Sequence, residues 1–178
     1  MDNKDGKKMT SCQKVFETKW FSIEAVSYED SKEEPYYRLS CGDAVVIIAV
    51  TPDKKIILVR QFRPAIGNYS LELPAGYIDE KESPEEAVKR ELMEETGFAC
   101  DSFTSLGSYE ISPSRINNAN HIFLGKGAKR ISVSSDQKEK CAVVLATKDE
   151  LNKLITEGKL VAIGVIGAYF LAQLKGFL

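Results

Sequence analysis

The chain has 178 residues, a length that suits one globular domain, with or without a small appendage, rather than two full domains. Its 24 basic and 26 acidic side chains give a net charge of -2, so the chain has no basic field that would attract nucleic acid or an anionic membrane. Its four cysteines are scattered and form no CxxC pair, which is typical of thiols in a reducing cytoplasm. We therefore expect a cytoplasmic protein whose partner is a small molecule.

The N-terminal part of the chain begins with polar residues and continues with a segment in which apolar and polar residues alternate. Residues 1–13 lack the apolar stretch of a signal peptide, and we expect them to form a short disordered lead. The segment WFSIEAV at 20–26 roughly alternates apolar and polar side chains, as a half-buried strand does. We therefore assign 14–40 to a small N-terminal β segment and 41–178 to the main domain.

Runs of apolar and β-branched residues predict the sheet of the main domain. The predicted strands cover 43–51, 55–62, 69–76, 103–112, 120–127 and 141–147. The first two of these strands are joined by the turn PDK. The stretch between the last two, at 128–140, is polar and has no period, and we expect it to form a mobile loop.

Capping signals mark the longest predicted helix. Ser83 and Glu86 match a capping box, and Pro84 suits the first helical position. Gly97 suits the left-handed residue that ends a helix. Together these residues predict a helix at 84–96.

Two more helices are predicted near the C-terminus. Thr147 and Glu150 match a second capping box, which opens a short helix. The apolar run at 160–174 is shorter than the ~20 residues needed to cross a bilayer, so we expect a buried helix there and no membrane partner. Strands and helices in this order predict an α+β fold with a mixed sheet.

Three glutamates, Glu91, Glu94 and Glu95, would crowd one side of the helix at 84–96. Glu91 and Glu95 have no cation three or four residues away, and Glu94 has only Arg90, in the less favourable order. Each like-charge pair costs an isolated helix roughly 0.2–0.5 kcal/mol, so a partner outside the helix should compensate. An all-oxygen cluster of this kind suits Mg²⁺ or Mn²⁺, and the alternative is a solvated acidic stripe.

The spacing of the whole segment resembles the Nudix box, G-x5-E-x7-R-E-U-x-E-E-x-G-U, where U is a bulky aliphatic or aromatic residue. The matching residues are Gly76, Glu82, Arg90, Glu91, Leu92, Glu94, Glu95, Gly97 and Phe98, and no position departs from the pattern. The resemblance implies an α/β/α sandwich around a mixed sheet. It also implies hydrolysis, dependent on a divalent metal such as Mg²⁺, of a nucleoside diphosphate linked to another group.

The resemblance also implies roles for individual residues. The implied metal ligands are the main-chain carbonyl of Ala75 and the carboxylates of Glu91, Glu94 and Glu95. Glu91 and Glu95 would thereby be catalytic. Glu82 matches the outer-shell glutamate of the box, and Arg90 matches the arginine that braces the loop-helix-loop segment through salt bridges.

The flanking sequence VRQFRPAIGNYSLELPAGYID resembles ADP-ribose and nucleotide-sugar pyrophosphatases. By this resemblance, Arg63 matches an arginine that contacts substrate phosphate, and Glu72 matches a glutamate close to the metal. Pro113 lies near a proline characteristic of the ADP-ribose group. Trp20 lies near the position where some relatives stack the substrate base, although packing in a dimer interface is an equal alternative.

The segment SPSRINNANHIF at 112–123 departs from the commoner pattern of that group. Ser114 and Asn118 stand where a glycine and a glutamate are usual. Arg115 could therefore read a different sugar or base, which leaves GDP-mannose and similar substrates open. An ordinary polar loop is the alternative interpretation.

The proton acceptor is predicted on the segment before the strand at 141–147. Glu139 matches an acidic position of the family there, and Asp136 is the alternative base. Gln137 stands where some relatives carry the acidic residue used as a base. Glu139 could therefore be a metal ligand instead, or a solvated charge.

Taken together, the sequence predicts a Mg²⁺-dependent hydrolase of ADP-ribose or a related nucleotide sugar. GDP-mannose or another nucleotide sugar is the alternative substrate. A domain that senses nucleotides without cleaving them is a further alternative, against which the intact box argues. The N-terminal segment resembles the sheet through which relatives pair, so a homodimer is expected.

Overall fold

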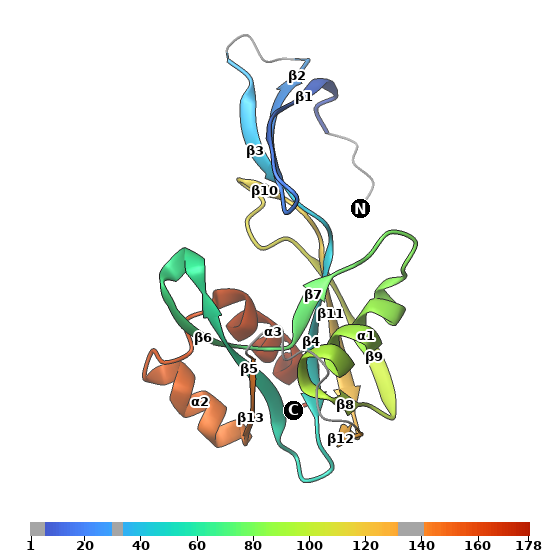
Figure 1. Ribbon diagram of the computed structural model, residues 1–178, viewed down its shortest axis with the longest axis vertical. Helices are drawn as coiled ribbons and strands as arrows, with labels where there is room; N and C mark the ends of the chain where they lie inside the picture. Colours follow the sequence, from blue (N-terminus) through green and yellow to red (C-terminus); the bar gives the residue numbers. More distant parts are fainter. Residues whose placement is uncertain (1–5, 30–33, 132–140) are drawn as a thin grey trace. The chain divides into compact units, whose positions relative to one another are not determined.

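The computed structural model describes residues 6–29, 34–131 and 141–178. These residues form two compact units, which we treat separately (Figure 1). Unit 1 comprises Met1–Asp43 and Glu110–Ala119, and unit 2 comprises Ala44–Tyr109 and Asn120–Leu178.

Unit 1 is a four-stranded sheet with the strand order β1-β2-β3-β10. Its strands are β1 (Met9–Glu17), β2 (Ser22–Tyr28), β3 (Tyr36–Ser40) and β10 (Ile116–Asn117). The first three strands pair antiparallel, whereas β10 runs parallel to β3. β1 begins inside the segment for which we expected disorder, because its backbone pairs with that of β2. Residues 110–119, which we assigned to the main domain, belong to this unit.

Unit 2 is built on a mixed sheet of seven strands. Its strands are β4 (Ala44–Val50), β5 (Ile56–Arg63), β6 (Asn68–Glu72), β7 (Ala75–Tyr77), β9 (Ser102–Tyr109), β11 (Asn120–Lys126) and β13 (Ala142–Ala146). The main path has the order β13-β5-β4-β11-β9, with β6 paired to β5 and β7 paired to β4. β4 and β11 run parallel, and the other neighbours run antiparallel.

Unit 2 also contains one 3-10 helix and two short strands outside the seven-stranded sheet. A 3-10 turn, η1 (Pro64–Ile66), connects β5 to β6. β8 (Phe98–Ala99) and β12 (Lys129–Arg130) form a separate two-stranded sheet. The path of the chain through β6 and β7 leads directly into the segment that carries the predicted site.

Helices cover both faces of the sheet of unit 2, because side chains alternate across each strand. The helices are α1 (Pro84–Thr96), α2 (Lys148–Thr156) and α3 (Ile163–Leu174). On one face Ile47 packs in a buried cluster with Leu92 of α1. On the other face Leu58 packs in a second cluster with Leu151 of α2 and Tyr169 of α3. The structure therefore confirms the predicted α+β fold, with α1 and the pair α2 and α3 on separate sides (Figure 1).

The helix ends agree with the capping signals. Ser83 and Glu86 form a reciprocal capping box at the beginning of α1, and Gly97 ends the helix at φ 72°. Thr147 and Glu150 form the same arrangement at the beginning of α2. Among the described residues, no helix is long and apolar enough to span a membrane.

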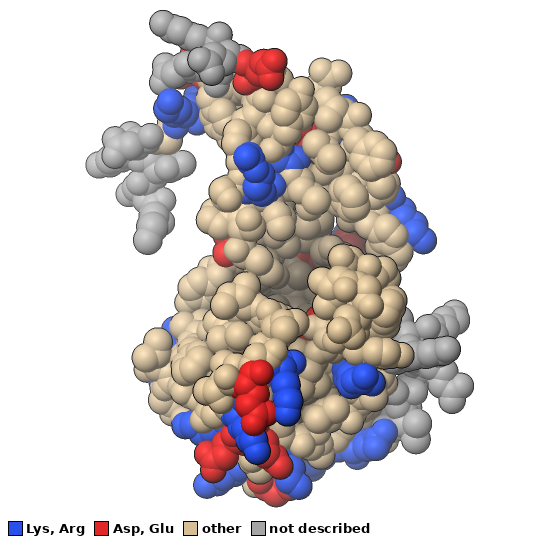
Figure 2. All heavy atoms as spheres, turned by 90° about the vertical axis from the view of Figure 1, so that its left-hand side faces the viewer, with Lys and Arg blue, Asp and Glu red and all other residues tan. Residues whose placement is uncertain are grey.

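The surface around α2 carries charges of both signs. Glu157 accepts from Lys159 at 2.7 Å and lies 3.8 Å from Lys153. Figure 2 shows acidic and basic side chains intermixed over the lower part of the face it presents. On this face the described basic side chains are interspersed with acidic ones.

Candidate catalytic and metal-binding site

α1 carries two glutamates on its buried side. Its buried residues include Ala87 and Leu92, and Glu91 and Glu95 follow Ala87 at intervals of four residues, on the same side of the helix. The Glu91 side chain is only 13% exposed. Burial raises the pKa of Glu91 above its usual value, against the opposing effect of the neighbouring Arg90. Arg90, which donates to Glu91 at 2.7 Å, is the positive partner of this carboxylate among the described residues, although no cation was expected three or four residues away.

β7 lies against this acidic side of α1. The main-chain N–H of Ala75 donates to Glu95 Oε2 at 3.0 Å. A Cβ placed on Gly76 would be 2.1 Å from the carboxyl carbon of Glu91, so the absence of a side chain lets Glu91 lie against the strand. The sheet and the helix thus place Ala75 beside Glu95 and Gly76 beside Glu91. The box pattern relates these residues only by their spacing in the sequence.

Arg90 joins the loop before α1 to the acidic side of the helix. Its N–H groups donate to Glu82 Oε1 and Oε2, both at 2.8 Å, to the Tyr77 carbonyl at 3.0 Å, to Glu91 at 2.7 Å and to Glu94 at 3.2 Å. The hydrogen bonds from Arg90 are the main reason that the pKa of Glu82 is lowered to about 2. The geometry therefore supports the bracing role predicted for Arg90 and Glu82.

The donor set is suitable for a hard divalent cation, because it consists of carboxylate oxygens and the Ala75 carbonyl. A cation beside the buried Glu91 would also offset the cost of burying its charge. Within the described residues, however, no three acidic, histidine or cysteine side chains converge closely enough to hold a metal. The observed contacts explain this result, because Arg90 donates to both Glu91 and Glu94 and the Ala75 N–H donates to Glu95. Metal binding by these residues stays a prediction.

A second arginine lies on the ribbon of β5 and β6. Arg63 Nε donates to Glu72 Oε1 at 2.9 Å, and Nη2 donates to Oε2 at 2.6 Å. The pKa of Arg63 is raised mainly by this hydrogen bonding, with a smaller contribution from the charge of Glu95. Arg63 and Glu72 are therefore electrostatically connected to the acidic side of α1.

Three of the predicted substrate-binding residues belong to unit 1. Trp20 is 63% exposed, and Lys19 Nζ lies 4.5 Å from the centre of its ring. The guanidinium of Arg115 stacks on the ring of Tyr36 at 4.8 Å. Pro113 is exposed in the turn before β10. Their substrate contacts stay predictions, as does the role of Glu139, which lies outside the described residues together with Asp136 and Gln137.

Sequence reasoning missed two contacts. The Tyr77 carbonyl accepts from Arg90, but a main-chain acceptor leaves no signal in the type of its residue. Tyr36 supports Arg115 in unit 1, and the adjacent tyrosines at 36 and 37 were the signal that could have indicated an exposed aromatic strand. The first contact joins residues 13 positions apart, and the second joins residues 79 positions apart.

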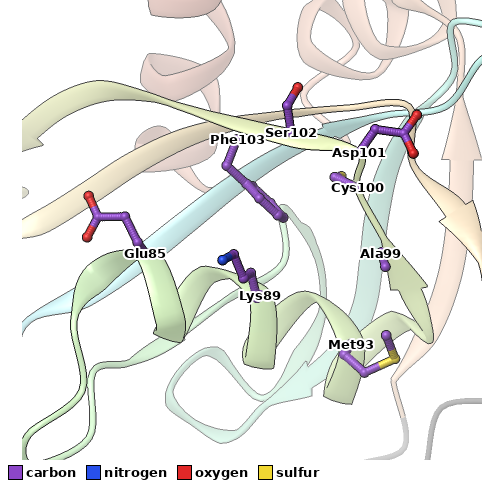
Figure 3. Close-up of a pocket in the computed structure, with 8 residues that line it drawn as sticks. All are labelled: Glu85, Lys89, Met93, Ala99, Cys100, Asp101, Ser102 and Phe103. Carbon is purple, nitrogen blue, oxygen red and sulfur yellow. The ribbon is translucent and has the colours of Figure 1, made fainter.

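A groove of about 440 Å³ lies on the other flank of α1. Its lining residues come from α1, β8, the following turn and the beginning of β9 (Figure 3): Glu85, Lys89, Met93, Ala99, Cys100, Asp101, Ser102 and Phe103. None of the predicted site residues is among them. Burial raises the pKa of Cys100 to about 11, so the thiol in this groove stays protonated near neutral pH.

The α/β/α sandwich of unit 2, with the complete box segment forming the loop and helix α1 against β7, has the features of a Nudix-class domain. The family model of the NUDIX domain matches residues 42–160 of this chain. The chain therefore belongs to the NUDIX domain family. The match includes α1, its preceding loop and the strands that position them.

Similar curated proteins have several different names. The chain is 33% identical to the methanol dehydrogenase activator of Bacillus methanolicus over 119 residues, which are 66% of this chain and 64% of that protein. It is 33% identical to the ADP-ribose pyrophosphatase of Bacillus subtilis over 117 residues, 66% of this chain and 62% of that protein. These matches span less than two thirds of either relative.

Two further matches cover a larger share of the similar protein. The GDP-mannose pyrophosphatase of Yersinia enterocolitica is 31% identical over 144 residues, 76% of this chain and 75% of that protein. A solved structure described as an ADP compounds hydrolase superposes with a TM-score of 0.78 and covers 97% of each chain. Its sequence identity of 24% supports a shared fold alone.

Proposed function

We propose that this protein hydrolyses the diphosphate linkage of ADP-ribose, or of a related nucleoside diphosphate sugar, with Mg²⁺ as cofactor. The products would be a nucleoside monophosphate and a sugar phosphate. The observation that carries the proposal is the complete box segment, in which Arg90 braces the loop while β7 holds Glu91 and Glu95 on the buried side of α1. The relatives named as pyrophosphatases support the same reaction class.

Each part of the site has a proposed role. The Ala75 carbonyl, Glu91, Glu94 and Glu95 would hold the cation. Mg²⁺ held there would neutralise the charge of the diphosphate and activate a water molecule. Arg63 would bind a phosphate group, since a guanidinium fork suits phosphate oxygens.

The remaining roles rest on the family resemblance. Glu139 would accept the proton of the attacking water, with Asp136 as the alternative. Trp20, Pro113 and Arg115 of unit 1 would contact the base or the sugar. We also propose a homodimer and a cytoplasmic location.

GDP-mannose is the second candidate substrate. The relative named GDP-mannose pyrophosphatase matches over 76% of this chain. Ser114 and Asn118 also stand where the ADP-ribose group usually has a glycine and a glutamate. A nucleotide sensor without catalysis would not need the intact acidic segment on α1.

A substrate panel tests the proposal. We would incubate the protein with ADP-ribose, GDP-mannose, UDP-glucose and a diadenosine polyphosphate in ¹⁸O-labelled water, with Mg²⁺ and separately with a chelator. The expected result is metal-dependent release of AMP and ribose 5-phosphate, and the position of the label identifies the phosphorus attacked. Preferred cleavage of GDP-mannose would select the second candidate. Binding without turnover of any substrate would contradict an enzymatic function.

A further inference from the structure

The β5–β6 ribbon has a polar side and an aromatic side. Gln61 and Arg63 alternate with Arg60 and Phe62 along β5, and the register pairs Gln61 with Ser70. Arg63, Gln61 and Ser70 therefore project to the side on which Ile57 packs with the core under α1. On the opposite side the Arg60 guanidinium stacks on Tyr69 at 4.0 Å.

The two arginines near the acidic side of α1 differ in their remaining donors. The N–H groups of Arg90 make five contacts within the loop and the helix, which matches the five donors of a guanidinium. Arg63 uses Nε and one N–H of Nη2, both on Glu72. Among the described residues, no acceptor is present at Nη1 of Arg63. Within this part of the chain, Arg63 thus has N–H groups left for a phosphate group, whereas all five donors of Arg90 are used.

Both carboxylate oxygens of Glu72 accept hydrogen bonds from Arg63. The Glu72 side chain is 15% exposed, compared with 44% for Arg63, so the carboxylate is the more buried partner. Burial raises the pKa of Glu72, but the hydrogen bonds and charge of Arg63 outweigh this effect and lower the pKa overall, with a smaller contribution from the Ser70 hydroxyl. Ser70 is itself only 4% exposed. The two hydrogen bonds hold the plane of the Glu72 carboxylate toward the Arg63 guanidinium.

We propose that Glu72, supported by Ser70, is a positioning residue that orients the Arg63 guanidinium so that its unused N–H groups bind a substrate phosphate. This inference rests on the proposed function for the identity of the substrate. It changes the role expected for Glu72 from direct contact with substrate or metal to control of Arg63. A side-on hydrogen-bonded pair fixes the plane of the guanidinium, and a fixed fork loses less entropy when it binds phosphate.

A double-mutant cycle separates the two roles of Glu72. The variants are Glu72→Gln, Arg63→Ala and the combination, assayed for kcat and KM on ADP-ribose over a range of Mg²⁺ concentrations. Glu72→Gln should raise KM on the order of 10-fold with kcat little changed. In the Arg63→Ala background, Glu72→Gln should change KM by less than about twofold, because the guanidinium that Glu72 orients is absent. An undiminished loss in that background, or a shift in the Mg²⁺ requirement, would overturn the inference.

Matched variants control for indirect effects. Ser70→Ala should reproduce part of the KM increase, and Glu72→Asp, which keeps the charge, should recover part of the loss. Arg60→Ala, on the aromatic side of the ribbon, should leave KM unchanged. Thermal unfolding of each variant shows whether it keeps the fold. If Glu72→Gln does not fold, Glu72→Asp replaces it in the cycle.

A binding measurement keeps the inference separate from the proposed function. The Nε–H NMR signal of Arg63, assigned by its loss in Arg63→Ala, should shift when inorganic pyrophosphate is added. Glu72→Gln should move this signal before any addition and weaken pyrophosphate binding on the order of 10-fold. If no nucleotide sugar is cleaved, the proposed function fails, and the pyrophosphate titration still decides the role of Glu72. No shift of the Arg63 signal in the wild-type protein would overturn the inference.

Discussion

The carboxyl group of Glu91 occupies the space that a side chain on Gly76 would need. A Cβ at residue 76 would lie 2.1 Å from both the carboxyl carbon and Oε1 of Glu91, whereas Cβ contacts below 3.0 Å are essentially never seen. The backbone of Gly76 is outside the left-handed region, so the requirement for glycine is one of space. A side chain at residue 76 would therefore displace the Glu91 carboxyl group, which is the end of a flexible side chain, from its place against β7.

We predict that Gly76→Ala displaces Glu91 and lowers kcat/KM by about 100-fold, since a misplacement of about 1 Å near the reacting groups costs this much. Steady-state kinetics on the preferred nucleotide sugar would measure the effect. Gly167→Ala on α3 is the control, because a Cβ there meets no atom within 4 Å. It should leave activity unchanged and stabilise the helix by up to about 1 kcal/mol. Normal activity in Gly76→Ala would mean that catalysis does not depend on the position of Glu91.

A second prediction concerns the carboxylates of α1. Glu91→Gln and Glu95→Gln remove a negative charge but keep the shape of the side chain. Each should lower turnover by more than about 100-fold, beyond the usual effect of an outer-shell residue. The helix should remain, as circular dichroism would verify. Glu85→Gln, on the flank that faces the groove of Figure 3, should have normal activity.

The reaction rate measured over a range of Mg²⁺ concentrations decides whether Glu91 and Glu95 are metal ligands. A lost ligand should raise the Mg²⁺ concentration needed for half-maximal rate, whereas a lost structural contact should not. Near-normal activity of Glu95→Gln at limiting Mg²⁺ would remove Glu95 from the metal site. A chelator should abolish the activity of the wild-type protein, and added Mg²⁺ should restore it.

The sequence predicted the helix ends because their causes are local. The capping box of Ser83 and Glu86 joins residues three positions apart, and Gly97 acts on the turn that it follows. The same holds for Thr147 and Glu150. Such signals work without knowledge of the fold, and they placed α1 at the predicted residues.

The sequence did not predict contacts that depend on strand pairing. β1 pairs along its length with β2, although all of its residues are exposed and they show no clear alternation of apolar and polar side chains. The contact of Arg63 with Glu72 follows from the β5–β6 register and has no local signal. Gly76 was recognised from the box, but its spatial reason needed the approach of β7 to Glu91. Long-range geometry therefore determines how the residues of the site are used.

A third prediction is that unit 1 mediates a homodimer. Its large exposed apolar side chains are Met9, Val15, Phe16, Trp20, Tyr36, Tyr37 and Ile111. We expect a second copy of the chain to cover part of this apolar surface. Light scattering at micromolar concentration should give the mass of a dimer.

Substitution of one aromatic residue tests which unit is responsible. Phe16→Ser should weaken the dimer on the order of 10-fold or more, as the loss of a large interface side chain does. Phe62→Ser is the matched control, since Phe62 in unit 2 is 52% exposed and Phe16 is 54% exposed. A monomeric wild-type protein with full activity would contradict the prediction.

The last prediction concerns a buried ion pair in unit 1. Arg38 Nε donates to Glu24 Oε2 at 2.8 Å between β2 and β3, with side chains that are 22% and 12% exposed. The hydrogen bond from Arg38 lowers the pKa of Glu24 against the opposing effect of burial. Removal of the carboxylate would leave the Arg38 charge largely buried without its partner, which is costly.

We predict that Glu24→Gln lowers the free energy of unfolding of unit 1 by about 1–3 kcal/mol at neutral pH. The folded pKa of Glu24 lies below the unfolded value of about 4.3, so the stabilisation is complete above that pH and is lost as the pH falls through the folded pKa. The difference between variant and wild type should therefore shrink in acid. Trp20, the only tryptophan, lies in unit 1, and its fluorescence during urea unfolding reports on this unit. Glu17→Gln, at a side chain 60% exposed, should have little effect, and an equal loss in both variants at every pH would show that Arg38 does not stabilise unit 1 through Glu24.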